Sequence, residues 1–178
     1  MARRSDSASF MPGVWVFPGG VVENVEDMAG VTGDDFDDDE RAHRACAVRE
    51  LQEEVGVALG AEAELYAWSR WITPEVVPVR FDTRFYLALA PPHTSPQPDE
   101  TEMSAVDWFN PARALERGAS GELELVFPTI KHLESLVPYG SAEEALDAAR
   151  QRVVEPILPR VVGSREEHRI LLPGDPDY

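Results

Sequence analysis

The fold and the chemistry of this chain are both indicated by one stretch, Arg49-Glu50-Leu51-Gln52-Glu53-Glu54-Val55-Gly56-Val57. On an α-helix, residues three and four positions apart are neighbours, with Cβ atoms about 5–6 Å apart. Glu50, Glu53 and Glu54 therefore converge on one face of a predicted helix. Converging carboxylates can bind a divalent cation, although a solvated acidic face is the commoner meaning of such a run.

The apolar residues of this stretch predict how the helix packs. Val48, Leu51 and Val55 recur on the opposite side, so the helix should pack on a core while its acids face away from it. Gly56 suits the left-handed residue that commonly follows a helix end. Cys46, which lies on the same helix, is expected to be a buried small residue rather than a reactive thiol.

A second motif, Phe17-Pro18-Gly19-Gly20, precedes the helix and follows a predicted strand over 14–17. Its glycines would let the backbone approach a metal ion or a phosphate closely. Glu26 follows six residues after Gly20. Together, Gly20-x5-Glu26 and the later stretch resemble the Nudix box, the signature of hydrolases that split nucleoside diphosphates linked to another moiety.

The box is interrupted here, because residues 27–48 separate its two halves. This interruption resembles one branch of the family, the peroxisomal-type coenzyme A diphosphatases and their bacterial relatives, which carry an insertion inside the box. Three further segments resemble the same branch: Trp71-Ile72-Thr73-Pro74-Glu75, Arg80-Phe81-Asp82-Thr83-Arg84-Phe85 and Arg169-Ile170-Leu171-Leu172-Pro173-Gly174-Asp175.

The resemblance implies a fold and an activity. The fold is the α/β (α+β) Nudix fold, a mixed β-sheet between helices, and the order of predicted elements agrees with it. The activity is metal-dependent cleavage of a phosphoanhydride in coenzyme A or acyl-coenzyme A, which yields 3',5'-ADP and a 4'-phosphopantetheine product. The alternatives are ADP-ribose or NADH as substrate, and a non-catalytic Nudix-fold module that binds a ligand or regulates a partner.

The resemblance also implies roles for residues of the box. Glu50, Glu53 and Glu54, with a backbone carbonyl near Gly20, would bind Mg²⁺ or Mn²⁺, since hard cations prefer oxygen ligands. Glu53 and Glu54 would thereby take part in catalysis. Arg49 lies one turn before Glu53 and would orient its carboxylate, and the alternative for Arg49 is a surface arginine.

Other assignments stay open at this level. Glu26 is the literal glutamate of the box loop, but the insertion follows it at once, so Glu40 competes for that position. Glu102 is the candidate general base, with a surface acid as the equal alternative. Arg80 and Arg84 are candidate contacts for substrate phosphates or adenine, because arginine forks bind phosphate, and a strand with solvated positions explains them equally well.

Composition limits the partners of the chain. Its 33 acidic and 16 basic residues give a net charge of −17, which argues against nucleic-acid binding. No apolar stretch is long enough to span a membrane, and the first residues do not resemble a signal peptide. With its single cysteine, the chain is expected to be cytoplasmic and to act on a small nucleotide-containing substrate.

We expect one domain over residues 1–178, with an acidic insertion at 24–40 and C-terminal helices and a tail at 128–178. Asp39 should cap the box helix, which we expect at 40–55. The other expected elements are strands at 65–72, 83–90 and, last, 106–109, and helices at 111–117, 128–137 and 141–150. Nudix proteins usually begin with two strands before the Phe-Pro-Gly-Gly turn, and no complete strand is expected before residue 14. Three alternatives follow: residues upstream of Met1 supply the strands, a partner strand fills the gap, or the fold is shortened. We expect a homodimer that covers the sheet edge.

Overall fold

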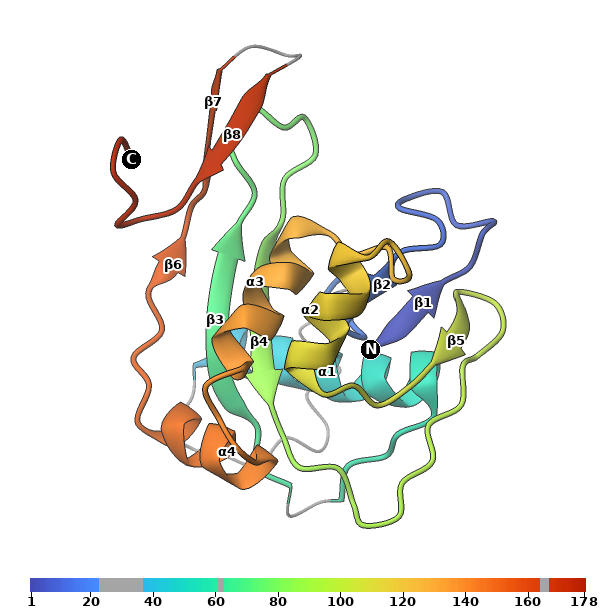
Figure 1. Cartoon of the computed structure of the whole chain (residues 1–178). Coiled ribbons are helices and arrows are strands. Elements are labelled where there is room, and N and C mark those ends of the chain that lie inside the picture. The colour runs from blue at the N-terminus through green and yellow to red at the C-terminus, as the bar shows by residue number, and fades with distance from the viewer. Residues whose placement is uncertain (23–36, 61–62, 164–166) are drawn as a thin grey trace. The chain divides into compact units, whose positions relative to one another are not determined.

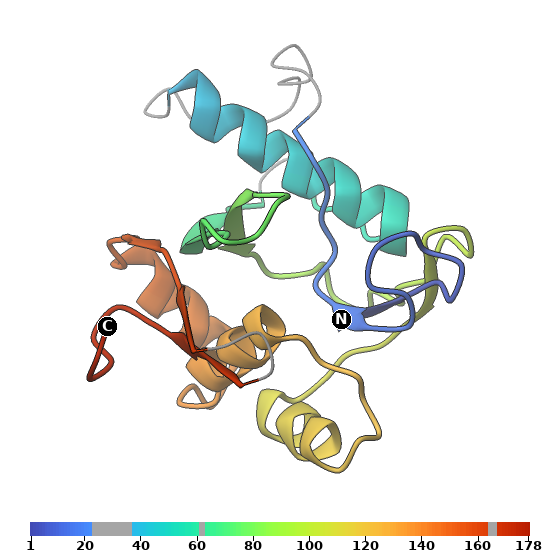
Figure 2. The ribbon, with the colours of Figure 1, turned by 90° about the horizontal axis from the view of Figure 1, so that it is seen from above.

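The computed structural model describes residues 1–22, 37–60, 63–163 and 167–178 (Figures 1 and 2). Contacts divide the chain into two compact units. The first unit comprises residues 1–64 and 89–145, and the second comprises residues 65–88 and 146–178. The single domain that we expect over 1–178 stays a prediction. Within the described ranges, no helix is both long and apolar enough to cross a bilayer.

A three-stranded antiparallel sheet in the first unit has the order β2-β1-β5. Its strands are β1 (Ala2–Arg4), β2 (Trp15–Val16) and β5 (Met103–Val106). The middle strand, β1, lies in a segment for which we expected no complete strand. The homodimer was predicted because a missing strand would expose the sheet edge. The presence of β1 removes that argument, and the homodimer stays a prediction.

The box helix, α1, runs from Asp38 to Val55 as one uninterrupted helix (Figure 2). Its N-cap is Asp37, whose carboxylate accepts a 2.8 Å hydrogen bond from the N–H of Glu40. The expected cap, Asp39, instead lies in the first turn, because Asp37 is the residue with extended backbone. Gly56 ends the helix at φ 66°, as the sequence predicts.

Three further helices follow: α2 (Pro111–Ala119), α3 (Phe127–Leu136) and α4 (Ala142–Arg150). All three were expected within a few residues. Asn110 caps α2 by accepting a 3.2 Å hydrogen bond from the N–H of Arg113. The strand expected at 106–109 is wrong, since β5 ends at Val106 and Phe109 packs edge-on against Trp15 with ring centroids 5.1 Å apart.

The second unit is built on β3 (Tyr66–Ile72), which pairs antiparallel with β4 (Asp82–Leu87) and parallel with β6 (Pro156–Ile157). A hairpin of β7 (Arg160–Gly163) and β8 (His168–Leu171) follows. The prediction that 106–109 is the last strand therefore fails here as well. β6 to β8 have two to four residues each, too few to show a clear alternation of apolar and polar residues.

A buried apolar cluster fixes the C-terminal end of α1 in the first unit. Val55 and Val57 pack with Ala2 of β1 and Met103 of β5, and Leu51 packs against this cluster. The expected apolar side of the helix is thereby confirmed for Leu51 and Val55. The cluster joins the box helix to β1 and β5, so the loops next to these strands lie beside the box.

Candidate active site

Glu54 is the most buried carboxylate of the box, with a relative exposure of 4%. The expectation that it faces away from the core is therefore wrong. Its Oε2 accepts a 2.9 Å hydrogen bond from the N–H of Gly19. Burial raises the pKa of Glu54 to about 7. The negative charges of Glu50 and Glu102 raise this pKa further, whereas the hydrogen bond from Gly19 and the positive charge of Arg4 lower it. Several charged groups thus meet around this side chain.

Arg49 joins the other two carboxylates of the box. Its Nη1 donates a 2.7 Å hydrogen bond to Glu53, and its Nη2 lies 2.8 Å from Oε1 of Glu50. Burial opposes the charge on the guanidinium, but the bond to Glu53 and the charge of Glu50 together raise the pKa of Arg49. The pairing of Arg49 with Glu53 agrees with the orienting role that the box implies.

Gly20 lies directly against the carboxylate of Glu50. A Cβ at position 20 would collide with all three atoms of that carboxylate, whereas a Cβ at Gly19 would meet no atom within 4 Å. The backbone N–H of Gly20 also bonds to Cys46, which is buried as expected. The second glycine of the turn therefore leaves the space in which Glu50 approaches the backbone.

Glu102 comes from the short turn before β5 and is exposed. Its carbonyl oxygen accepts a 2.7 Å hydrogen bond from the N–H of Ser5, which ties the turn to the end of β1. Its charge raises the pKa of Glu54, so the two carboxylates lie within electrostatic range of each other. The structure thus brings the candidate base to the box helix.

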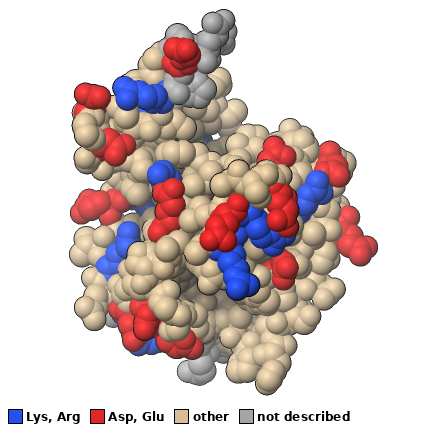
Figure 3. Space-filling view, in the orientation of Figure 1, with Lys and Arg blue, Asp and Glu red and all other residues tan. Residues whose placement is uncertain are grey.

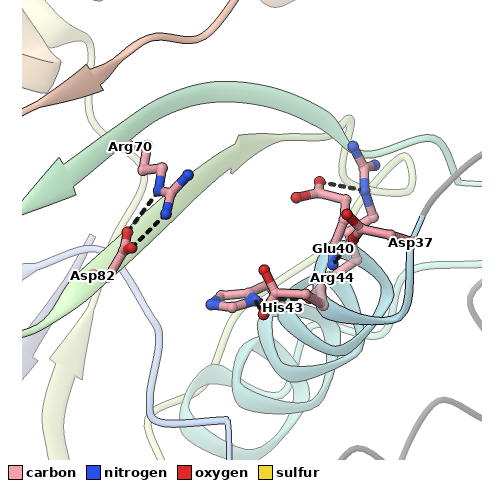
Figure 4. A network of polar contacts seen from close by, with 7 residues as sticks. Asp37, Glu40, His43, Arg44, Arg70 and Asp82 are labelled. Carbon is pink, nitrogen blue, oxygen red and sulfur yellow. Dashed lines mark hydrogen bonds and ion pairs between the residues drawn. The ribbon is translucent and has the colours of Figure 1, made fainter.

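Of the two candidates for the loop carboxylate, Glu26 lies outside the described residues. Glu40 pairs with Arg44, whose Nε lies 2.8 Å from Oε1 of Glu40 (Figure 4). Glu40 precedes Glu50 by ten residues on the same helix, which corresponds to about 15 Å along its axis. The structure therefore does not bring Glu40 to the carboxylates of the box.

Arg80 and Arg84 belong to the second unit. Arg80 is exposed, and its Nε donates a 3.0 Å hydrogen bond to the carbonyl of Thr73. Arg84 lies in β4 opposite Arg70, which binds Asp82 through two hydrogen bonds of 2.8 and 2.6 Å (Figure 4). A contact between Arg80 or Arg84 and substrate stays a prediction.

The donors of the box suit a hard divalent cation. Carboxylate oxygens such as those of Glu50, Glu53 and Glu54 are the ligands that Mg²⁺ prefers, and the backbone of Gly20 lies close to the carboxylate of Glu50. Across the described part of the chain, no three acidic, His or Cys side chains already enclose a metal position. Both Glu50 and Glu53 are paired with the guanidinium of Arg49.

Sequence reasoning missed two neighbours of Glu54. Arg4, which lies in β1, lowers the pKa of this carboxylate. No local sequence pattern links β1 to α1. Asp99 donates its backbone N–H to the carbonyl of Glu54 over 3.1 Å, and its carboxylate accepts hydrogen bonds from the N–H groups of Glu102 and Met103. The spacing Asp-x-x-Glu could have indicated this second arrangement, since aspartate often bonds to backbone N–H groups a few residues ahead.

Comparison with known proteins shows which proteins the chain resembles. The chain is 29% identical over 216 residues to "Putative nudix hydrolase 7" of Caenorhabditis elegans, an alignment that covers all of this chain and 68% of that protein. It is 33% identical over 139 residues to acyl-coenzyme A diphosphatase NUDT19 of Gallus gallus, covering 67% of this chain but only 36% of that protein.

A solved structure has the same fold. The NUDIX hydrolase from Alicyclobacillus acidocaldarius matches with a TM-score of 0.71 and 29% identity, over 82% of this chain and 86% of that one. The expected Nudix fold is thereby confirmed. The family model for the NUDIX domain matches residues 1–127, and members of this family use divalent metal ions. The chain therefore belongs to the NUDIX hydrolase family.

Proposed function

We propose that this protein is a Mg²⁺- or Mn²⁺-dependent diphosphatase that acts on coenzyme A or acyl-coenzyme A. The observation that carries the hydrolytic role is the attachment of the turn that bears Glu102 to the box helix: the N–H of Asp99 donates to the carbonyl of Glu54, and the carboxylate of Asp99 accepts from the N–H of Glu102. The interrupted box supports the choice of substrate. So does the similarity of two thirds of the chain to a protein named as an acyl-coenzyme A diphosphatase.

The charge distribution supports a cation at the box. Residues 65–88 and 146–178 carry eight basic and eight acidic residues, so the whole net charge of −17 belongs to the first unit. On the face shown in Figure 3, most basic side chains lie next to acidic ones. A diphosphate approaching the first unit would be repelled unless a cation neutralised the box carboxylates.

Glu50, Glu53 and Glu54 would hold the cation, with backbone oxygen from the Gly19–Gly20 turn. When bound, a divalent cation neutralises negative charge on the diphosphate and lowers the pKa of water. Arg49 would fix the carboxylate of Glu53. The buried Glu54 is held in place by Gly19.

Glu102 would accept the proton of the attacking water. The water oxygen forms a new bond to one phosphorus, and the bond between that phosphorus and the bridging oxygen breaks. The bridging oxygen leaves with the electron pair as part of the other phosphate. For coenzyme A the products are 3',5'-ADP and 4'-phosphopantetheine, and the exposed position of Glu102 lets it release its proton to solvent.

Arg80 and Arg84 would contribute to substrate affinity rather than to bond cleavage. Their guanidinium groups can bind phosphate, and Phe81, next to Arg80, is 45% exposed and can stack on a base. Replacing either arginine should therefore raise KM more than it lowers kcat.

A substrate panel tests the proposal. The purified protein is incubated with Mg²⁺ and, separately, with coenzyme A, acetyl-coenzyme A, ADP-ribose and NADH, and products are measured by mass spectrometry. We expect 3',5'-ADP from both coenzyme A compounds, with a kcat/KM at least about tenfold above that for the other two. Preferred cleavage of ADP-ribose or NADH would contradict the substrate but keep the reaction, and no cleavage of any compound would contradict the proposed function.

A further inference from the structure

We propose that Asp99 is a positioning residue that holds Glu102 in reach of the box helix. This inference rests on the role proposed for Glu102 as general base. Asp99 itself is not expected to touch substrate. It acts through a set of hydrogen bonds that connect the turn carrying Glu102 to the C-terminal end of α1.

The carboxylate of Asp99 organises the turn. Its Oδ2 accepts a 3.0 Å hydrogen bond from the N–H of Glu102, and its Oδ1 accepts a 2.8 Å bond from the N–H of Met103. The N–H of Glu100 closes the turn by bonding to the carbonyl of Met103 over 3.0 Å. Burial opposes ionisation of Asp99, but the backbone N–H groups of Glu102, Met103 and Thr101 lower its pKa, so the carboxylate is charged and bound to the turn.

The backbone of the same segment is attached to the box helix. The last carbonyl groups of a helix have no partner inside it and must be satisfied from elsewhere. Here the N–H of Gln97 donates to the carbonyl of Val55 over 2.9 Å, and the N–H of Asp99 donates to that of Glu54 over 3.1 Å. Asp99 therefore binds the helix through its backbone and the base-bearing turn through its side chain.

This double attachment gives Asp99 a role that Glu100 does not share. Glu102 is exposed, so packing does not restrict its position, and the hydrogen bonds of its backbone do. Met103, by contrast, is fully buried and keeps β5 in place without Asp99. Loss of the Asp99 carboxylate should thus release the turn around Glu102 while the strand and the core remain.

The test combines D99A with E102Q in a double-mutant cycle of turnover on the preferred substrate with Mg²⁺. We expect D99A to lower kcat by about tenfold or more with KM nearly unchanged, because a misplaced catalytic group affects chemistry. If Asp99 acts through Glu102, D99A should have almost no further effect in the E102Q background. D99N, which keeps an acceptor for Met103, should recover much of the activity, and E100Q is the charge-matched control.

The outcomes separate this inference from the proposed function. Full activity in D99A, or equal loss from D99A with and without Glu102, would overturn the role of Asp99 while hydrolysis itself stands. Wild-type turnover in E102Q would overturn the base and the positioning role together. Absence of hydrolysis in the wild type would overturn the proposed function and leave the next measurement to judge Asp99.

A readout without turnover uses backbone hydrogen exchange of the metal-free protein. The N–H groups of Glu102 and Met103 donate to the carboxylate of Asp99, so D99A should speed the exchange of the Glu102 N–H. D99N, which keeps an acceptor, and E100Q should leave that exchange closer to the wild type. Unchanged exchange of Glu102 in D99A would contradict the positioning role.

Discussion

The backbone N–H of Gly19 donates a 2.9 Å hydrogen bond to Oε2 of Glu54 and thereby holds the Phe-Pro-Gly-Gly turn against the box helix. The two residues are 35 positions apart, on either side of the insertion. The interrupted box is thus reassembled in space, with its glycine turn and its helix in direct contact. The next two predictions test each side of this contact.

Replacing Glu54 should make the metal-free protein more stable at high pH. Its pKa rises from 4.5 to about 7 on folding, so between these values the folded chain binds more protons than the unfolded chain. The free energy of unfolding therefore decreases as pH rises through this range. In EDTA at pH 8, the free energy of unfolding of E54Q should exceed that of the wild type by on the order of 2 kcal/mol. The Gln side chain has no charge to bury and can still accept the hydrogen bond from Gly19.

Thermal unfolding at two pH values checks this prediction. The difference between E54Q and the wild type should narrow at pH 5.5, where the wild-type carboxyl is largely protonated in the folded chain. An E54Q variant that is less stable than the wild type at pH 8 would show that the charge of Glu54 is already well compensated without metal.

The two glycines of the turn should tolerate alanine differently. A Cβ at Gly20 would displace the carboxylate of Glu50, so G20A should lower kcat/KM by about 10²-fold. G19A is the matched control, because the added methyl group meets no atom within 4 Å and the donor N–H is kept. Steady-state kinetics with Mg²⁺ compare the two variants, and equal losses would mean that contact with Glu50 is not what requires glycine.

The N-cap of α1 can be tested by stability alone. D37A removes the side chain that accepts from the N–H of Glu40 and should cost about 1 kcal/mol, or roughly 2–4 °C in unfolding temperature. D39A should cost less, because Asp39 lies within the first turn. Turnover at saturating Mg²⁺ should be unchanged in both. A larger loss in D39A would contradict the cap assignment.

The position of the N-cap at Asp37 limits how far the insertion can be shortened without a loss of stability. Deleting residues 30–38 should keep metal-dependent activity if the segment is a tolerated loop, since closure entropy grows slowly with length. Because Asp37 is the cap, however, this deletion should also lower stability. Deleting residues 30–36 keeps the cap and is the cleaner variant. Loss of Mg²⁺ affinity with the fold retained would show that the insertion supplies ligands.

The sequence predicts the elements whose signals are local. The box helix, its Gly56 end and the Asn110 cap follow from spacing and cap residues. The choice among three consecutive aspartates as N-cap depends on backbone conformation, which spacing does not reveal. β1 and β6 have two or three residues each, and their pairing partners are distant in sequence, so no periodicity could predict them.

The site was predicted in part for the same reason. Helical spacing places Glu53 one turn after Arg49, and the structure shows their ion pair. It does not predict that Glu54 is buried, because this depends on the Gly19 turn covering it. The attachment of Asp99 depends on a loop more than forty residues along the chain, beyond the reach of any local pattern.

The most direct test of the account is the turnover of E53Q, compared with the wild type, in an assay of 3',5'-ADP release from coenzyme A with Mg²⁺. The Glu53 side chain is 59% exposed, so its replacement should leave the unfolding temperature within about 2 °C. If the carboxylates of α1 form the hydrolytic centre, kcat should fall by about 10²-fold or more. A folded E53Q that releases 3',5'-ADP at the wild-type rate would contradict that centre.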